Sequence, residues 1–174
     1  MANFAAVAHL DTFELAGSLR TRLGLFKPAG LITTGWWRLQ VRGSKTGAEG
    51  EFVRYKPVSN WAELTNLRND IQRRAETLMP PGIEFGRIFF EMLDPGAVVA
   101  ERGEVEPYFL EWTRTILPLR TNPGLTLLYG NETASPGAGW LTAVNPRLPR
   151  AAINMGDAPA VWLVLDFRRK VADG

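Results

Sequence analysis

The strongest constraint on the fold lies in residues 113–167, where short runs of alternating residues are separated by turn residues. The run from Arg114 to Leu119 alternates with the period of two that is typical of a strand and is rich in β-branched residues. Thr121-Asn122-Pro123-Gly124 follows as a turn, because proline fixes φ and glycine accepts positive φ. Leu125 to Tyr129 is the next apolar run, so we predict that the two strands form a hairpin.

Three further strands are predicted after this pair. They are Trp140 to Ala143, Arg150 to Asn154 and Val161 to Phe167, with the turn Asn154-Met155-Gly156-Asp157 before the last of them. Short strands at close spacing, joined by turns rich in glycine and proline, indicate a β-barrel or sandwich.

The N-terminal half carries both kinds of periodicity. A helix is predicted from Asp11, which resembles a capping residue, through Leu15, Leu19 and Leu23. A second helix, from Asn60 to Leu78, has the apolar stripe Leu64, Leu67 and Ile71, which we expect to pack on the outside of a sheet. The remaining predicted elements are Met1 to Ala8 (coil or an edge strand), Trp36 to Arg42, Phe52 to Lys56 and Ile88 to Leu93 (strands), and an exposed loop at 43–50.

Length and composition indicate one ordinary globular domain. The chain has 174 residues, of which 45% are hydrophobic and 22% charged. We predict a single domain over 1–174, with 1–92 flanking a barrel core at 93–167. The net charge of +2, with dispersed basic residues, argues against a nucleic-acid partner. No apolar run has the length of a membrane span and no signal-like segment is present, so the cytoplasm is the expected compartment.

Several short motifs occur in a fixed order in the C-terminal part. They are Leu117-Pro118-Leu119, Thr121-Asn122-Pro123, Gly137-x-x-Trp140, Asn154-x-Gly156-Asp157 and a last strand that ends in Asp166. In this order and spacing the chain resembles the aspartyl/asparaginyl β-hydroxylase-like group of iron(II)/2-oxoglutarate oxygenases, from residue 93 onward. The resemblance implies a mainly β fold with flanking helices, the double-stranded β-helix, which is a jelly-roll, cupin-like barrel.

The resemblance also implies where a metal site would lie. Aligned on its motifs, the family's first iron-binding histidine falls on Arg102, its carboxylate on Glu104 and its second histidine on Arg150. The arginine that would bind the far carboxylate of 2-oxoglutarate falls on Ala160. A second 2-oxoglutarate contact, an Arg-x-His pair, falls on Arg114 and Ile116, so that only its arginine is retained.

These replacements have a direct chemical consequence. An iron(II) site of this type needs two imidazoles and a carboxylate on one face. A guanidinium has donors only and stays protonated, so it cannot ligate a metal, and two of them repel a cation. The only histidine of the chain is His9, far from these motifs, and there is no cysteine.

We therefore predict a pseudoenzyme, a non-catalytic binding or structural protein that has no metal and no cofactor. Its site would be the degenerate barrel mouth formed by Arg102, Glu104, Arg114 and Arg150. We expect Glu104 to pair with Arg102, Arg150 or both, so that guanidinium charge stands where metal charge would. The surplus positive charge favours an acidic side chain of a partner or a small anion. An internal salt-bridge cluster without a ligand is the structural alternative.

Two other classes of function stay open from the sequence. One is an iron(II)/2-oxoglutarate-dependent hydroxylase with atypical ligands, whose ligands either lie at other positions or include His9, and which would require iron and 2-oxoglutarate. The other is a small-molecule binder that uses the arginine-lined mouth. For the non-catalytic reading, the expected partner is another protein or further copies of the chain, and a role in an assembly such as a virion is one option.

Overall fold

The computed structural model describes residues 4–20, 24, 26–29, 35–42, 73, 81–102 and 107–169. Several predictions lie outside these residues: the loop at 43–50, the strand from Phe52 to Lys56, the packing of the helix from Asn60 to Leu78, and the position of Glu104. Among the described residues, no helix combines the length and the apolar character needed to cross a membrane.

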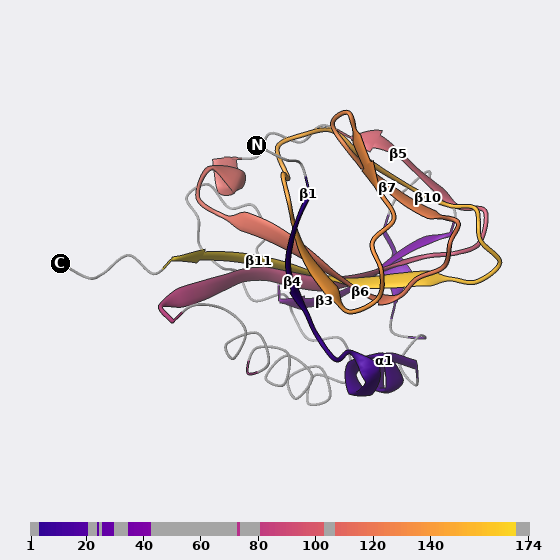
Figure 1. Cartoon of the computed structure of the whole chain (residues 1–174), viewed down its shortest axis with the longest axis horizontal. Helices are drawn as coiled ribbons and strands as arrows, with labels where there is room; N and C mark the ends of the chain where they lie inside the picture. The colour runs from indigo at the N-terminus through magenta and orange to yellow at the C-terminus, as the bar shows by residue number, and fades with distance from the viewer. Residues whose placement is uncertain are drawn as a thin grey trace.

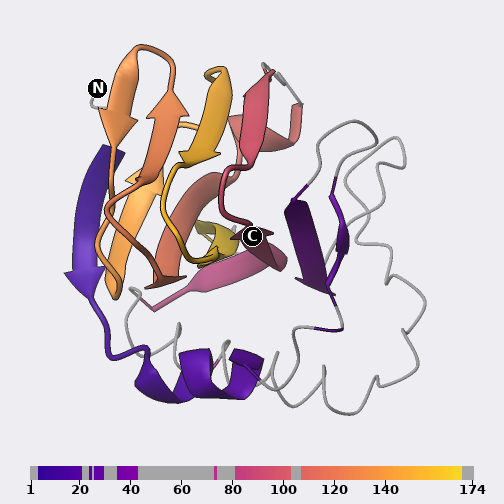
Figure 2. The same cartoon turned by 90° about the vertical axis from the view of Figure 1, so that its right-hand side faces the viewer.

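Two antiparallel sheets, one α-helix and the short 3-10 helix Pro107–Leu110 make up the described fold (Figures 1 and 2). The larger sheet has seven strands in the order β1-β9-β6-β11-β4-β3-β2, and the smaller has four in the order β5-β10-β7-β8. In the larger sheet the bounds are β1 (Phe4–His9), β2 (Lys27–Pro28), β3 (Trp36–Arg42), β4 (Ile83–Leu93), β6 (Thr113–Arg120), β9 (Trp140–Val144) and β11 (Ala160–Arg169). In the smaller sheet they are β5 (Val98–Arg102), β7 (Leu125–Tyr129), β8 (Glu132–Ala134) and β10 (Arg150–Asn154).

The larger sheet is covered on both faces. Figure 1 shows the smaller sheet above it and helix α1 (Phe13–Arg20) below it. Along β11, Val161, Leu163 and Leu165 join the core that includes the α1 leucines. Trp162 and Val164 join the core that includes the smaller sheet. Because both faces are buried, β11 is apolar almost throughout instead of alternating with polar residues.

The five predicted C-terminal strands are all present, as β6, β7, β9, β10 and β11. They are distributed over two facing sheets, which is the arrangement of a jelly roll, so the predicted fold class is confirmed. The predicted hairpin of β6 with β7 is wrong, because β6 pairs with β9 and β11 whereas β7 pairs with β8 and β10. The turn after β6 reverses the chain, but it carries the chain from one sheet to the other.

Two asparagines hold that crossover turn against the turn that precedes β11. Asn122 Nδ2 donates to Asn154 Oδ1 at 3.0 Å and to the Ala158 carbonyl at 2.8 Å. Asn154, which is fully buried, donates to the Leu93 carbonyl at 2.9 Å. A Cβ on Gly124 would lie 2.2 Å from the Gly156 nitrogen, so the two turns need glycine for their close approach. The Thr-Asn-Pro-Gly and Asn-x-Gly-Asp motifs therefore form one structural unit.

The N-terminal elements agree with their sequence signals. Helix α1 buries Leu15 and Leu19 as predicted, and Asp11 Oδ1 accepts a hydrogen bond from the Phe13 nitrogen at 2.9 Å, as a cap does. The segment predicted as coil or an edge strand, Met1 to Ala8, contributes to β1, which is an edge strand of the larger sheet. Strands β3 and β4 both lie within the larger sheet, and β4 pairs with β3 on one side and β11 on the other.

Candidate functional site

The space between the two sheets contains charged side chains as well as an apolar core. Glu91, Arg114 and Asp166 are each at most 4% exposed. A buried charge is tolerated only when it is paired and hydrogen-bonded. The contacts of these three residues therefore define the polar interior of the barrel.

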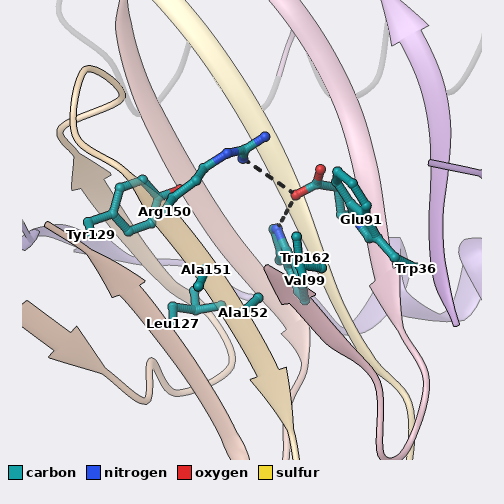
Figure 3. Close-up of a pocket in the computed structure, with 9 residues that line it drawn as sticks. All are labelled: Trp36, Glu91, Val99, Leu127, Tyr129, Arg150, Ala151, Ala152 and Trp162. Atoms are coloured by element: carbon teal, nitrogen blue, oxygen red, sulfur yellow. Dashed lines mark hydrogen bonds and ion pairs between the residues drawn. The ribbon is translucent and has the colours of Figure 1, made fainter. Parts of the chain in front are cut away.

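Glu91, on β4, is the centre of one cluster (Figure 3). Its Oε1 accepts a hydrogen bond from Arg38 Nη2 at 2.7 Å, and its Oε2 accepts one from Trp162 Nε1 at 3.0 Å. Arg150 Nη1 lies 3.9 Å from the same Oε2, which is an ion pair without a direct hydrogen bond. Burial raises the pKa of Glu91, but the positive charges of Arg150 and Arg38 outweigh this effect, so the net pKa lies below its usual value.

A small cavity lies beside this carboxylate, where Arg150 reaches toward Glu91 (Figure 3). The cavity has a volume of about 20 Å³, which holds about one water molecule. The lining residues come from both sheets: Trp36, Glu91, Val99, Leu127, Tyr129, Arg150, Ala151, Ala152 and Trp162.

Arg150 is held in place by the Glu91 carboxylate on one side and by a hydrogen bond to the Tyr129 hydroxyl on the other. Burial lowers the pKa of its guanidinium, while Glu91 and Tyr129 raise it, and the net pKa is raised. The side chain as a whole is 22% exposed. Arg150 is therefore a permanent positive charge in the lining of the cavity.

Arg114 forms a separate pair with Asp166 on the neighbouring strand. Arg114 Nε lies 2.7 Å from Asp166 Oδ1 and Nη2 lies 2.8 Å from Oδ2, so the contact is bidentate. Burial lowers the pKa of Arg114 and the Asp166 carboxylate raises it by more. The guanidinium also lies over the rings of Phe109, at 4.7 Å, and Phe89, at 5.4 Å. Because this charge is neutralised inside the fold, the pair is structural.

The four residues predicted at the barrel mouth differ in their positions and contacts. Arg102 and Arg150 are directly opposite each other in the register of β5 and β10, so the backbone brings these two positions together. Arg150 lines the cavity, whereas Arg114 is paired with Asp166. Glu104 lies outside the described residues, and the carboxylate that the described structure places near Arg150 is Glu91.

Sequence reasoning did not identify Glu91 as a site residue, named Asp166 only as the end of the last strand, and missed the contacts of Arg38 and Trp162. A signal for two of them was available. Glu91 is the acidic residue in the apolar run from Ile88 to Leu93, and Asp166 stands in the equally apolar run from Val161 to Phe167. A carboxylate inside a strand that is buried on both faces must have a positive partner.

Iron does not fit the described residues at this place. The position expected for the second histidine holds a guanidinium, which has no lone pair for a metal. His9 lies at the end of β1, where its ring contacts Trp140 at 5.2 Å, in the larger sheet and not on β5 or β10. Ala160, at the position expected for the 2-oxoglutarate arginine, is a fully buried methyl group at the start of β11. Among the described residues, no group of three potential ligands could hold a metal ion.

Comparison with known proteins by sequence gives no match, either to a family model or to a curated protein. Comparison by structure gives many matches. A 2OG-Fe(II) oxygenase family oxidoreductase from Burkholderia pseudomallei is similar with a TM-score of 0.67 at 11% identity, over 96% of this chain and 86% of that one. A prolyl-4-hydroxylase from Pseudomonas putida has a TM-score of 0.56 at 19% identity, over 97% and 94% of the two chains. HygX from Streptomyces hygroscopicus, solved with nickel and 2-oxoglutarate, has a TM-score of 0.58 at 8% identity, over 96% and 83%.

At these identities the similarity concerns the fold. The sheet order, the two-sheet core and the similarity over nearly the whole chain agree on one architecture. The protein has the jelly-roll fold that members of the 2OG-Fe(II) oxygenase family also have.

Proposed function

We propose that this protein is a non-catalytic binding protein on a 2-oxoglutarate-oxygenase-like scaffold, and that its barrel mouth binds an acidic group. The observation that carries the proposal is the position of Arg150. It occupies the place where the family resemblance expects an iron-binding histidine, and its guanidinium is bound inside the fold to Glu91 and Tyr129. A side chain held in this way supplies a fixed positive charge, not a metal ligand.

The balance of charge supports an anionic ligand. Arg38 and Arg150 both face the single carboxylate of Glu91, which leaves one surplus positive charge among these three residues. Arg114 adds nothing to this surplus because Asp166 neutralises it. The partner of the exposed part of Arg150 would be the carboxylate of another protein, of a second copy of the chain, or a small anion.

The size of the cavity limits how such a ligand binds. A volume of about 20 Å³ corresponds to about one water molecule. The acidic group would therefore contact Arg150 from the mouth without entering the interior. This geometry suits a side chain on the surface of a protein partner.

A hydroxylase with atypical ligands is the second candidate. It is favoured by the similarity to oxygenase structures over nearly the whole chain, including one with nickel and 2-oxoglutarate. In that case Glu91 or Glu104 would provide the carboxylate ligand, and Arg150 would have to move away from Glu91.

One experiment separates the two candidates. The purified chain is incubated anaerobically with iron(II), desalted and assayed for bound iron, and then for succinate formed from 2-oxoglutarate. We expect neither stoichiometric iron nor succinate. Stoichiometric iron, with turnover that is lost in Glu104→Ala or Glu91→Gln but kept in the exposed-site variant Glu111→Gln, would establish the hydroxylase.

Anion binding is tested by thermal unfolding in succinate, phosphate and sulfate against chloride at matched ionic strength. We expect these anions to raise the Tm of the native chain, and Arg150→Met to remove most of the increase. Arg120→Met is the matched control, because Arg120 is an exposed arginine at the end of β6. An equal response of the native chain and both variants would mean that the anions act without the barrel mouth.

A further inference from the structure

Glu91 receives its hydrogen bonds from its own sheet. Strand β4 lies between β3 and β11, and the residues directly opposite Glu91 in these two strands are Arg38 and Trp162. Arg38 Nη2 donates to Oε1 at 2.7 Å, and Trp162 Nε1 donates to Oε2 at 3.0 Å. Each oxygen of the carboxylate therefore has a donor whose place is fixed by the register of the strands.

Arg150 reaches the same carboxylate from the other sheet. It belongs to β10, and Figure 3 shows its guanidinium and the Trp162 indole converging on one oxygen of Glu91. Arg150 Nη1 lies 3.9 Å from this oxygen, which is too far for a direct hydrogen bond. A buried carboxylate has to be hydrogen-bonded, and Glu91 meets this requirement without Arg150. Of its three contacts, the one with Arg150 is therefore the one that can be exchanged with the smallest loss.

We propose that Glu91 is an internal competitor for Arg150, and that Arg150 exchanges this ion pair for the carboxylate of a ligand. The inference rests on the proposed function, in which Arg150 binds an acidic group. The exchange replaces an ion pair of 3.9 Å with a direct, charge-assisted hydrogen bond, which is the stronger contact. It leaves no buried charge without a partner, because Arg38 and Trp162 stay with Glu91. Glu91 then determines how tightly the site binds an anion.

The local charge indicates the simplest probe for this exchange. Arg38 and Arg150 carry two positive charges against the one negative charge of Glu91. A ligand with a single carboxylate makes this group neutral, whereas Arg114 is already neutralised by Asp166. Acetate carries one carboxylate and little else, so its affinity reports the contact with Arg150 directly.

Two substitutions around the same carboxylate should change acetate binding in opposite directions. Glu91→Gln should tighten binding by about tenfold or more, because it removes a negative charge 3.9 Å from Arg150 Nη1. Trp162→Phe removes the donor from Oε2, so that Arg150 can approach this oxygen, and binding should weaken by about threefold or more. Damage to the fold would weaken binding in both variants, so the opposite signs identify the competition.

The dissociation constant of acetate is measured by NMR titration of the whole chain at constant ionic strength and neutral pH. Glu111→Gln is the control for Glu91→Gln, because it removes an equal charge from an exposed pair with Arg168 and should leave the constant unchanged. The indole N–H signal that is missing from the spectrum of Trp162→Phe identifies Trp162. Acetate should shift this signal in the native protein but not in Arg150→Met, since Arg150 moves away from the oxygen that Trp162 binds.

The outcomes separate this inference from the proposed function. A native chain that binds no acetate, or binds it as well as Arg150→Met does, would refute the proposed function and the competition together. Binding that depends on Arg150 but is unchanged or weakened in a folded Glu91→Gln would overturn the competition and leave the proposed function standing. If Glu91→Gln does not fold, Trp162→Phe decides, and unchanged or tighter binding in this variant would overturn the competition.

Discussion

Asp166 lies directly opposite Arg114 in the register of β11 and β6, and both oxygens of its carboxylate contact the Arg114 guanidinium. Asp166 is fully buried and Arg114 is 4% exposed. This pair lies at the end of the β6–β11 contact and is neutral overall, so it allows two charges within the interior of the barrel without a ligand.

Asp166→Asn should therefore destabilise the protein by about 3–5 kcal/mol, because a buried guanidinium is left without its counter-charge. The measurement is the free energy of unfolding in urea. Asp157→Asn is the control, since Asp157 is exposed in a turn, and it should change stability by less than about 0.5 kcal/mol. The double variant Arg114→Met/Asp166→Leu should recover most of the loss. If it is as unstable as Asp166→Asn, the loss does not come from the unpaired charge.

Glu91→Gln should lower the free energy of unfolding at neutral pH by about 3–5 kcal/mol, since Arg38 and Arg150 lose the charge between them. The pKa of Glu91 is lowered from its usual 4.5. A lowered pKa in the folded state stabilises the protein above the unfolded pKa, and this contribution is lost as the pH falls through the folded pKa. The difference in free energy of unfolding between the native protein and Glu91→Gln should thus be constant at neutral pH. It should shrink below about pH 4.5.

The control for this pH dependence is Glu111→Gln, because Glu111 is 67% exposed in its pair with Arg168. An exposed pair contributes about 0–1 kcal/mol. The free energy of unfolding of the native protein is compared with that of Glu91→Gln at each pH. If this difference grows as the solution is acidified, Glu91 is not an ionised, stabilising carboxylate.

Asn154→Ala should destabilise the protein by about 1–3 kcal/mol, because the buried Leu93 carbonyl loses its side-chain donor and Asn122 loses an acceptor. Chemical denaturation measures the change. Asn145→Ala is the matched control, because the Oδ1 of Asn145 accepts a solvent-exposed hydrogen bond from the Arg147 nitrogen. Equal effects of the two substitutions would mean that the contact between the turns adds little to stability.

Gly86→Ala should displace the ring pair formed by Tyr108 and Trp112, whose centroids are 5.2 Å apart in a stacked arrangement. A Cβ at Gly86 would lie 2.1 Å from the Tyr108 hydroxyl and 2.7 Å from the Trp112 ring. We expect an altered near-ultraviolet circular dichroism spectrum and a loss of about 1–3 kcal/mol from overpacking.

Replacing a glycine of α1 by alanine should instead stabilise the protein. Gly17→Ala adds a Cβ that meets nothing within 4 Å, inside the helix Phe13–Arg20. It should stabilise the protein by about 0.5–1 kcal/mol through helix propensity. A stabilising Gly86→Ala would mean that the aromatic pair does not pack on β4 as described.

The sequence by itself determined the local elements. Alternation located β6, β7, β9, β10 and β11, and helical spacing located the buried leucines of α1, because these patterns follow from which face of an element is buried. The order of the turn motifs pointed to the jelly roll, and it placed Arg102 and Arg150 at positions that prove to be opposite each other. That inference came from the family resemblance, not from periodicity.

Only the tertiary structure decided which elements and which charges are partners. The turn at Asn122 indicates that the chain reverses direction, but a turn does not specify which sheet the next strand joins. For this reason β6 and β7 lie in different sheets, although a hairpin was predicted. Likewise, the apolar runs around Glu91 and Asp166 imply that both carboxylates are buried. Their partners lie far away in the sequence, 52 residues between Arg114 and Asp166 and 71 between Glu91 and Trp162. A local pattern carries no information about such pairings, because they are fixed by strand register and by the packing of one sheet on the other.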